Sequence, residues 1–372
     1  MRGIAVLLVL WYHVWEISWQ PAPLPWLQFI PETGFIGVQL FFFLSGFVIV
    51  YPFLRAQVSG TTTPSWGHFA FRRFIKIVPS YLLSIGVAYL IGYAATQNYV
   101  PLPLWQELGS HLLFVQSWWQ PTIGSINGVL WTLTVEVQFY LVFPLTWWLF
   151  KRWPWPTGAL LIGVAIAWRS YWSHCCFHTT FQLMGYNLPA YLDMFACGML
   201  CAWAFMHLGP RVRELRLTGL MPAVTLLGLG LAVWLLEAIY GFKRADEWEQ
   251  AGLVHTQGLY GLAFALVAFG ALTSPRLWQL LLDNPVLRFF AIISYNLYLY
   301  HQMVARELVT HHWPPYSGDP HADQHWQLVY TWIALAAAIA QAALITYLFE
   351  RPVMQIPDPG RKKALAGHSS TV

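Results

Sequence analysis

The sequence is short of charged residues. Only 10% of its 372 residues are Asp, Glu, Lys or Arg, whereas 57% are hydrophobic. A water-soluble domain carries roughly 25% charged residues, because water has to solvate its surface. This chain has too few for such a surface, so lipid is the solvent that suits it. The small net charge of +4 argues against a nucleic-acid partner.

Cysteine is scarce, and the features of a cleavable leader are missing. Nothing about the four cysteines requires an oxidising compartment. The first residues show neither the basic segment nor the small-residue cleavage site of a signal peptide. Because the first apolar run, residues 3–17, is short for a membrane span, we expect the natural start to lie a few residues upstream.

Long apolar runs, separated by short polar or Pro- and Gly-rich breaks, are abundant. They predict an all-α, polytopic transmembrane bundle of about ten spanning helices, near residues 3–19, 34–54, 77–96, 129–150, 157–172, 189–207, 217–240, 253–272, 289–310 and 328–349. Segment 104–119 is apolar but short, which favours an interfacial or re-entrant piece. We predict one membrane domain over residues 1–352 and a disordered cytoplasmic tail over residues 353–372.

The positions of the basic residues predict an orientation. With both termini in the cytoplasm, the cytoplasmic side holds 16 of the 20 Lys and Arg residues: Arg2, Arg55, Arg72, Arg73, Lys76, Lys151, Arg152, Arg211, Arg213, Arg216, Arg276, Arg288, Arg351, Arg361, Lys362 and Lys363. An arbitrary placement would divide them about evenly between the two sides, so this one follows the positive-inside rule. We therefore expect a multi-pass protein of a bacterial inner or cell membrane.

Arg2 and His13 form the first candidate catalytic pair. They are eleven residues apart, which puts them on one helix face and about 16 Å apart along the axis. Arg2 would lie at the cytoplasmic end and His13 near mid-membrane, where an imidazole is costly unless it faces a polar cavity. Histidine is the usual general base near neutral pH. The alternative is a topology-setting Arg and a His bonded to a neighbouring helix.

Glu136 is the second candidate catalytic residue, inside the predicted span 129–150. A carboxylate in the membrane needs a partner. It could hold a proton, orient His13 or pair with Arg169. A structural ion pair or a protonated, hydrogen-bonding acid is the alternative.

A basic run precedes the third span and is a candidate for binding an anionic cofactor. Arg72, Arg73 and Lys76 lie at a predicted cytoplasmic mouth, where they could bind the phosphates of a nucleotide. They could also be a topology anchor that contacts lipid headgroups.

Other polar residues are weaker candidates for the functional site. Asp193 could face an outer vestibule and bind substrate, or could be an ordinary acid at a helix N-terminus. His301 and Arg306 could pair with Glu307 or line a cavity. The spacing of histidine and cysteine over residues 174–178 fits no common metal site, so we expect no metal.

Taken together, several segments resemble the acyltransferase-3 family of integral membrane O-acyltransferases. These segments are RGIAVLLVLWYH, GVQLFFFLSGF, FAFRRFIKIVPSY, LWTLTVEVQFYLVFP, ISYNLYLYH and FERP, in the order expected for the family. They run from Arg2 to about Pro352. Three positions depart from the pattern: Gln39 replaces a frequent acid, Lys76 replaces an arginine, and Val137 replaces a second glutamate. The resemblance implies a stand-alone member without the esterase-like extracellular domain of some relatives.

The resemblance also implies a reaction. Acyl-CoA, in the form of acetyl-CoA, would dock from the cytoplasm near Arg72, Arg73 and Lys76, and Arg2 would steer it. An acceptor hydroxyl of a glycan or glycolipid would enter from outside, past Glu136 and Asp193. His13 would remove its proton or briefly carry the acyl group. The alternative function is a transporter or flippase for an acyl group, a glycolipid or a proton-coupled solute.

Overall fold

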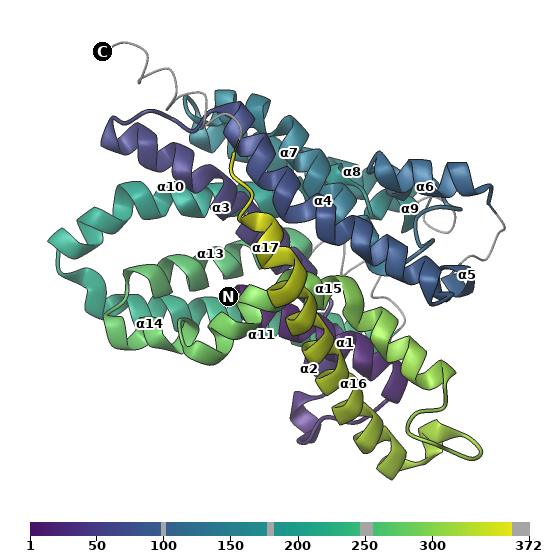
Figure 1. Ribbon diagram of the computed structural model, residues 1–372. Helices are drawn as coiled ribbons and strands as arrows, with labels where there is room; N and C mark the ends of the chain where they lie inside the picture. Colours follow the sequence, from purple (N-terminus) through teal and green to yellow (C-terminus); the bar gives the residue numbers. More distant parts are fainter. Residues whose placement is uncertain (98–101, 177–181, 246–255, 359–372) are drawn as a thin grey trace.

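Figure 1 shows the computed structural model of the chain, which is a bundle of long helices. The structure describes residues 1–97, 102–176, 182–245 and 256–358, and within these ranges it contains no β-strand. In chain order the helices are α1 (Arg2–Ser18), α2 (Phe29–Thr33), α3 (Ile36–Ser59), α4 (Trp66–Leu90), α5 (Tyr93–Gln97), α6 (Leu104–Leu112), α7 (Trp131–Phe150), α8 (Pro154–Cys176), α9 (Gln182–Gly185), α10 (Leu192–Glu214), α11 (Met221–Arg244), α13 (Gln257–Thr273), α14 (Arg276–Leu282), α15 (Pro285–Thr310), α16 (Gln324–Ile345) and α17 (Arg351–Met354).

The predicted all-α membrane bundle is confirmed. Each of the ten predicted spans corresponds to one long helix: α1, α3, α4, α7, α8, α10, α11, α13, α15 and α16. Among the described residues, six segments are long and apolar enough to cross a membrane: Ile36–Val58, Trp66–Leu90, Gly128–Phe150, Leu188–Glu214, Leu217–Arg244 and Gln324–Met354. The other four helices are shorter or more polar, so the count of ten spans stays a prediction.

Segment 104–119 is short, as predicted for an interfacial or re-entrant piece. It contains the nine-residue helix α6 and a single 3-10 turn, Gln116–Trp118. A nine-residue helix rises only about 13 Å, which is less than half the hydrocarbon thickness. The predicted tail begins within α17, and its residues from 359 onward lie outside the described part of the chain.

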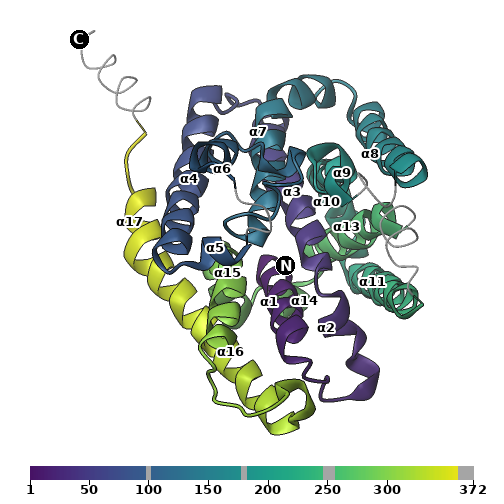
Figure 2. The same cartoon turned by 90° about the vertical axis from the view of Figure 1, so that its right-hand side faces the viewer.

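Helix α1 lies inside the bundle, between α3 and α15, with α16 beside it (Figure 2). Glycines bring these helices close together. A methyl group at Gly37 of α3 would lie 2.3 Å from the Ala5 carbonyl oxygen, and one at Gly3 would lie 2.5 Å from the Leu287 carbonyl oxygen. Small residues allow such close backbone approach in membranes. The N-terminal end of α1 is therefore placed firmly against both α3 and α15.

Helices α3 and α10 form another close pair. A methyl group at Gly46 would lie 2.2 Å from the Phe195 carbonyl oxygen, and one at Gly198 would lie 2.0 Å from the Phe43 carbonyl oxygen. Gly37, Gly46 and Gly198 thus let α3 pack closely against α1 and α10. Ser45, on the same helix as Gly46, donates a hydrogen bond to the Glu136 carboxylate.

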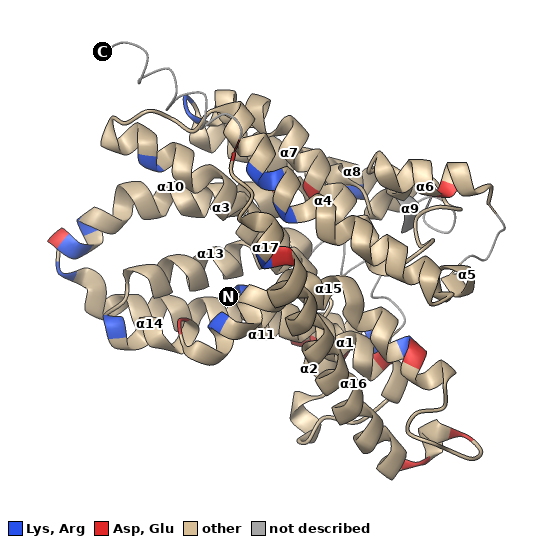
Figure 3. Cartoon of the chain, viewed as in Figure 1, with Lys and Arg blue, Asp and Glu red and all other residues tan. Residues whose placement is uncertain are grey.

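Charged residues are distributed unevenly over the bundle. In Figure 3 the blue Lys and Arg segments gather at the left and upper ends of the helices, whereas the loops at the lower right carry mainly red acidic segments. This is the pattern that the positive-inside rule predicts for a membrane protein whose left and upper side faces the cytoplasm.

Candidate active site

Helix α1 carries the two residues on which the site is built. Its apolar residues form a continuous 17-residue helix that is buried at Val6, Val9 and Leu10. Arg2 and His13 both contact α15, Arg2 at Ser294 and His13 at His301. The prediction that the two residues share one face of this helix therefore agrees with the structure.

Arg2 extends into a pocket between α1, α3, α7 and α15. Its Nε donates a hydrogen bond of 2.9 Å to the Ser294 hydroxyl, and its guanidinium lies 5.8 Å from the centre of the Phe41 ring. The pocket has an empty volume of about 430 Å³, including the open space at its mouth. Its remaining lining residues are mainly apolar or aromatic: Val38, Phe42, Ser45, Thr132, Leu133, Glu136, Tyr295 and Tyr298.

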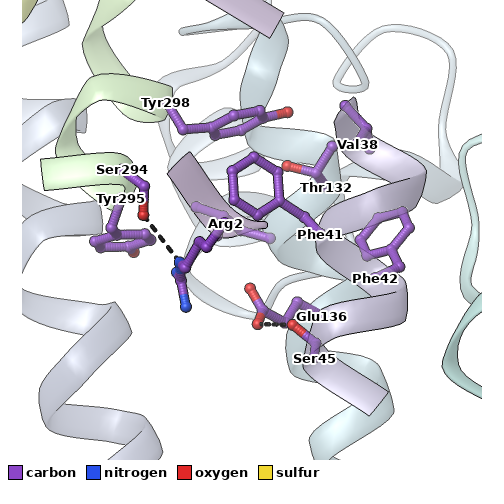
Figure 4. Close-up of a pocket in the computed structure, with 11 residues that line it drawn as sticks. Arg2, Val38, Phe41, Phe42, Ser45, Thr132, Glu136, Ser294, Tyr295 and Tyr298 are labelled. Atoms are coloured by element: carbon purple, nitrogen blue, oxygen red, sulfur yellow. Dashed lines mark hydrogen bonds between the residues drawn. The ribbon is translucent and has the colours of Figure 1, made fainter. Parts of the chain in front are cut away.

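Glu136 is the acid of this pocket. Its Oε1 accepts hydrogen bonds from the Ser45 hydroxyl, at 2.8 Å, and from the Tyr140 hydroxyl. In Figure 4 the Glu136 carboxylate and the Arg2 guanidinium point into the same space from opposite sides, and no bond joins them. Opposite charges that face each other across a gap can hold a polar ligand between them. The structure shows no hydrogen bond from Glu136 to His13.

His13 forms a pair with His301, which is fully buried in α15. His301 Nε2 lies 3.0 Å from His13 Nδ1, and the two ring centres are 4.8 Å apart at an interplanar angle of 64°. His13 itself is half-buried, and its ring also contacts Tyr12 edge-on. His13 thus contacts a neighbouring helix, as the alternative interpretation predicts, and its role in catalysis stays a prediction.

The hydrogen-bond partners of the two imidazoles indicate which ring nitrogens carry a hydrogen. His301 Nδ1 lies 2.8 and 3.0 Å from the carbonyl oxygens of Tyr298 and Leu297. A carbonyl only accepts, so this nitrogen carries the hydrogen and His301 Nε2 is an acceptor. His13 Nδ1 lies 3.0 Å from the Val9 carbonyl and therefore also carries its hydrogen, which it can share with His301 Nε2. In the neutral ring His13 Nε2 is then left with a lone pair.

The Arg2 pocket and the histidine pair are linked along α15. Ser294 and His301 are seven residues apart, which is two helical turns on one face and about 10 Å. Tyr298 lies between them: it lines the pocket, and its ring centre is 5.8 Å from that of His301. A molecule that enters beside Arg2 and reaches past Tyr298 would therefore arrive at the histidine pair.

Two of the three predicted cofactor-binding residues, Arg73 and Lys76, lie near the same pocket. The Arg73 guanidinium lies 5.4 Å from the Tyr140 ring centre, and Lys76 lies 5.2 Å from the Tyr295 ring centre. Lys76 also forms an ion pair with buried Glu350, whereas Arg72 is exposed at the surface. Arg2, Arg73 and Lys76 thus present positive charge around the Glu136–Tyr140 end of the pocket.

The predicted substrate-binding residue Asp193 has a different setting. It is fully buried, and its Oδ2 accepts a hydrogen bond of 2.7 Å from Arg169. Its other oxygen accepts from the Met194 backbone N–H. Arg169, which the sequence suggested as a partner of Glu136, therefore has Asp193 as its ion-pair partner. Binding of substrate by Asp193 stays a prediction.

In the part of the chain that the structure describes, no group of three or more His, Cys, Asp or Glu side chains could hold a metal ion. The histidine and cysteine segment 174–178 lies partly outside that part.

Comparison with known proteins decides the family. A family model described as an acyltransferase domain matches residues 1–351, which is almost the whole chain. The chain belongs to the acyltransferase-3 family. The resemblance seen in the sequence is thereby confirmed, and the domain is an acyltransferase domain of the kind that moves groups other than aminoacyl groups.

Three relatives illustrate this similarity. Nodulation protein 10 of Rhizobium leguminosarum bv. viciae is 24% identical over 96% of this chain and 92% of its own length. The peptidoglycan O-acetyltransferase OatA of Listeria monocytogenes is 23% identical over 81% of this chain, and the match spans about half (48%) of OatA. The acyltransferase MdmB of Streptomyces mycarofaciens is 37% identical over 34% of this chain and 32% of its own length. No solved structure matches the chain.

In this acyltransferase-3 domain, the structure adds residues that sequence reasoning missed or left undecided. His301 was a candidate only for pairing with Glu307 or lining a cavity, and Glu307 instead lies 3.4 Å from His311. Ser45, Tyr140 and Ser294 were not candidates. The sequence shows that Ser294 and His301 are seven residues apart. Their relevance to the site follows only from their contacts with Arg2 and His13 of α1.

Proposed function

We propose that this acyltransferase is a membrane O-acyltransferase. It moves an acyl group, most simply acetyl, from cytoplasmic acyl-CoA to a hydroxyl of a glycan or glycolipid on the outer side of the membrane. The observation that carries the proposal is the free lone pair of His13 Nε2, because His301 and the Val9 carbonyl both engage the opposite ring nitrogen. An imidazole in this state is ready to accept a proton.

The donor would enter from the side of Arg2. Acyl-CoA carries phosphates at one end and a thioester at the end of a long pantetheine arm. Arg72 and Arg73 would supply positive charge for the phosphates, with Lys76, which is paired with Glu350, beside them. Arg2 and Glu136 would supply polar contacts within the pocket. The distance of about 10 Å from Ser294 to His301 along α15 is one that an extended arm can cover.

The reaction then follows from the position of His13. His13 Nε2 removes the proton from the acceptor hydroxyl while the hydroxyl oxygen attacks the thioester carbonyl. The new C–O ester bond forms, the C–S bond breaks, and the thiolate leaves as CoA thiol with the proton that His13 held. In the alternative course, Nε2 attacks the thioester carbonyl, an N–C bond forms and the C–S bond breaks to release the CoA thiolate. The acceptor oxygen then displaces Nε2 from the acyl group, and the hydroxyl proton goes to the thiolate. Both courses need the same ring nitrogen.

The orientation and the relatives support this assignment. The gathering of Lys and Arg at one side favours cytoplasmic N- and C-termini in a bacterial cell membrane. OatA is named for peptidoglycan O-acetylation, which is consistent with a glycan acceptor here. The proposed protein has one membrane acyltransferase domain over residues 1–352 and a cytoplasmic tail over residues 353–372. The proposed reaction requires no metal.

Replacing His13 tests the function. His13→Ala should lower transfer of labelled acetyl from acetyl-CoA to membrane glycans by about a hundredfold or more, the contribution of a general base. His207→Ala is a matched control, because His207 is exposed on α10 and bonds only its own helix. Equal transfer by wild type and a well-inserted His13→Ala variant would rule the proposal out.

A further inference from the structure

A second pocket lies beyond the histidine pair, at the ends of α1, α5 and α15. Its lining residues are Ile17, Tyr93, Thr96, Gln97, Arg306, Glu307, Val309 and Thr310, and its empty volume is about 760 Å³ with the open space included. Ile17 is one turn past His13 on α1, and Figures 1 and 2 both show α5 beside the end of α15. This pocket shares no lining residue with the Arg2 pocket.

Arg306 is the cation of this second pocket. Its side chain is exposed, and among the described residues it forms no ion pair and no side-chain hydrogen bond. The neighbouring acid, Glu307, has its carboxylate 3.4 Å from His311 Nε2 instead. A guanidinium offers five N–H donors in a planar fork that matches a carboxylate or a phosphate. Arg306 therefore has its full donor set available to a ligand.

Tyr93 gives a second and independent sign of a ligand. Its side chain is 1% exposed, yet its hydroxyl has no hydrogen-bond partner. A buried hydroxyl without a partner costs free energy, which a ligand that accepts its hydrogen would recover. Because Tyr93 and Arg306 line the same pocket, both can reach one bound group.

We propose that this second pocket, the Arg306 pocket, binds an acidic group, a carboxylate or a phosphate, on the glycan acceptor. Arg306 forms the charged contact and the Tyr93 hydroxyl donates to the same group. Arg306 lies five residues, or about 7.5 Å of helix rise, beyond His301. A sugar ring bound there can present a hydroxyl to His13. The inference rests on the proposed function, and it adds that acceptors are selected by negative charge.

Binding of a matched pair of saccharides tests this inference without relying on transfer. The neutral probe is N,N′-diacetylchitobiose, and the acidic probe is N-acetylglucosaminyl-N-acetylmuramic acid, which adds one lactyl carboxylate. With the purified full chain in phosphatidylcholine nanodiscs, the acidic probe should bind at least about tenfold more tightly, as expected for a charge-assisted contact. Arg306→Ala should abolish the difference, and Arg306→Lys should keep part of it.

Two further variants separate a binding role from a structural one. Tyr93→Phe should weaken binding of the acidic probe a few-fold, because it removes only the unpartnered hydroxyl. Binding of the neutral probe and the unfolding temperature should stay unchanged. Arg244→Ala removes another exposed cation, which contacts Tyr240 of its own helix. It should change the binding affinity for neither probe.

The outcomes distinguish the two proposals. Equal binding of the two probes by wild type, or an equal loss for both in Arg306→Ala, overturns the charge selection even if transfer occurs. Loss of the acidic preference when phosphatidylglycerol replaces phosphatidylcholine also overturns it, because a lipid headgroup is then the occupant. Charge-selective binding that depends on Arg306 supports the inference even if no acyl transfer is found, in which case only the proposed reaction fails.

Discussion

At the scale of residues, the central feature is the proton assignment of the two imidazoles. His13 was identifiable from the sequence, because an imidazole eleven residues after Arg2 in an apolar helix is unusual. Its partner was not identifiable, because His301 lies 288 residues away and sequence periodicity carries no information about contacts between helices. The same applies to Ser45 and Tyr140, which hold the Glu136 carboxylate. The sequence could name the ionisable residues but not their hydrogen-bond partners.

The histidine pair predicts an effect of substitutions at His301. His301→Leu removes the acceptor for His13 Nδ1–H, so the ring can rotate or adopt the other tautomer. We expect kcat to fall by about ten- to a hundredfold with little change in the KM for acetyl-CoA. His301→Gln places an amide oxygen in reach of the same hydrogen and should recover part of the rate. Steady-state kinetics of the purified variants would measure both effects.

The pH profile separates this positioning role from a purely structural one. A His301 variant that has lost only packing would keep the wild-type pH dependence of kcat. A change in the hydrogen bond to His13 should shift the pH at which activity appears, because the proton affinity of the base has changed. If His301→Leu has the wild-type profile and rate, His301 does not position His13.

At the scale of elements, the sequence predicted the helices better than their ends. Predicted span 77–96 corresponds to α4, which begins at Trp66, eleven residues earlier. Ser65 caps this helix by accepting a hydrogen bond from the His68 backbone N–H, so the basic run is its first turns and not a loop. Hydropathy marks where a helix leaves the lipid, but a cap marks where the helix begins. A π-helical turn at Thr346–Glu350, which brings Glu350 to Lys76, likewise has no signal in hydropathy.

The close pairing of α3 and α10 predicts which glycines cannot be replaced. Gly198→Ala puts a methyl group against the Phe43 carbonyl and should force the helices apart, which costs about 1–3 kcal/mol of stability. Gly230→Ala is the control, because a methyl group there meets nothing within 4 Å. Thermal unfolding in detergent should show a lower midpoint for the first variant and an unchanged midpoint for the second. Equal midpoints would mean that the α3–α10 contact is looser than described.

At the scale of the whole molecule, the orientation of the bundle is the main prediction. Reporter fusions after residue 62, between α3 and α4, should be fluorescent with green fluorescent protein and inactive with alkaline phosphatase, because that loop faces the cytoplasm. Fusions after residue 317, between α15 and α16, should behave in the opposite way. The reverse result at both sites would invert the orientation, and with it the sides proposed for donor and acceptor.

The ring contacts around Tyr298 also bear on the ion gradient of the membrane. In the proposed orientation, the Arg2 pocket opens toward one aqueous phase and the Arg306 pocket toward the other. Between them, the Tyr298 ring packs against Phe41 at 5.9 Å and against His301 at 5.8 Å. A continuous water-filled path would let protons leak and dissipate the energy stored across the membrane. The aromatic contacts would close such a path, so two substrates could bind from opposite sides of the membrane without a proton leak between the two pockets.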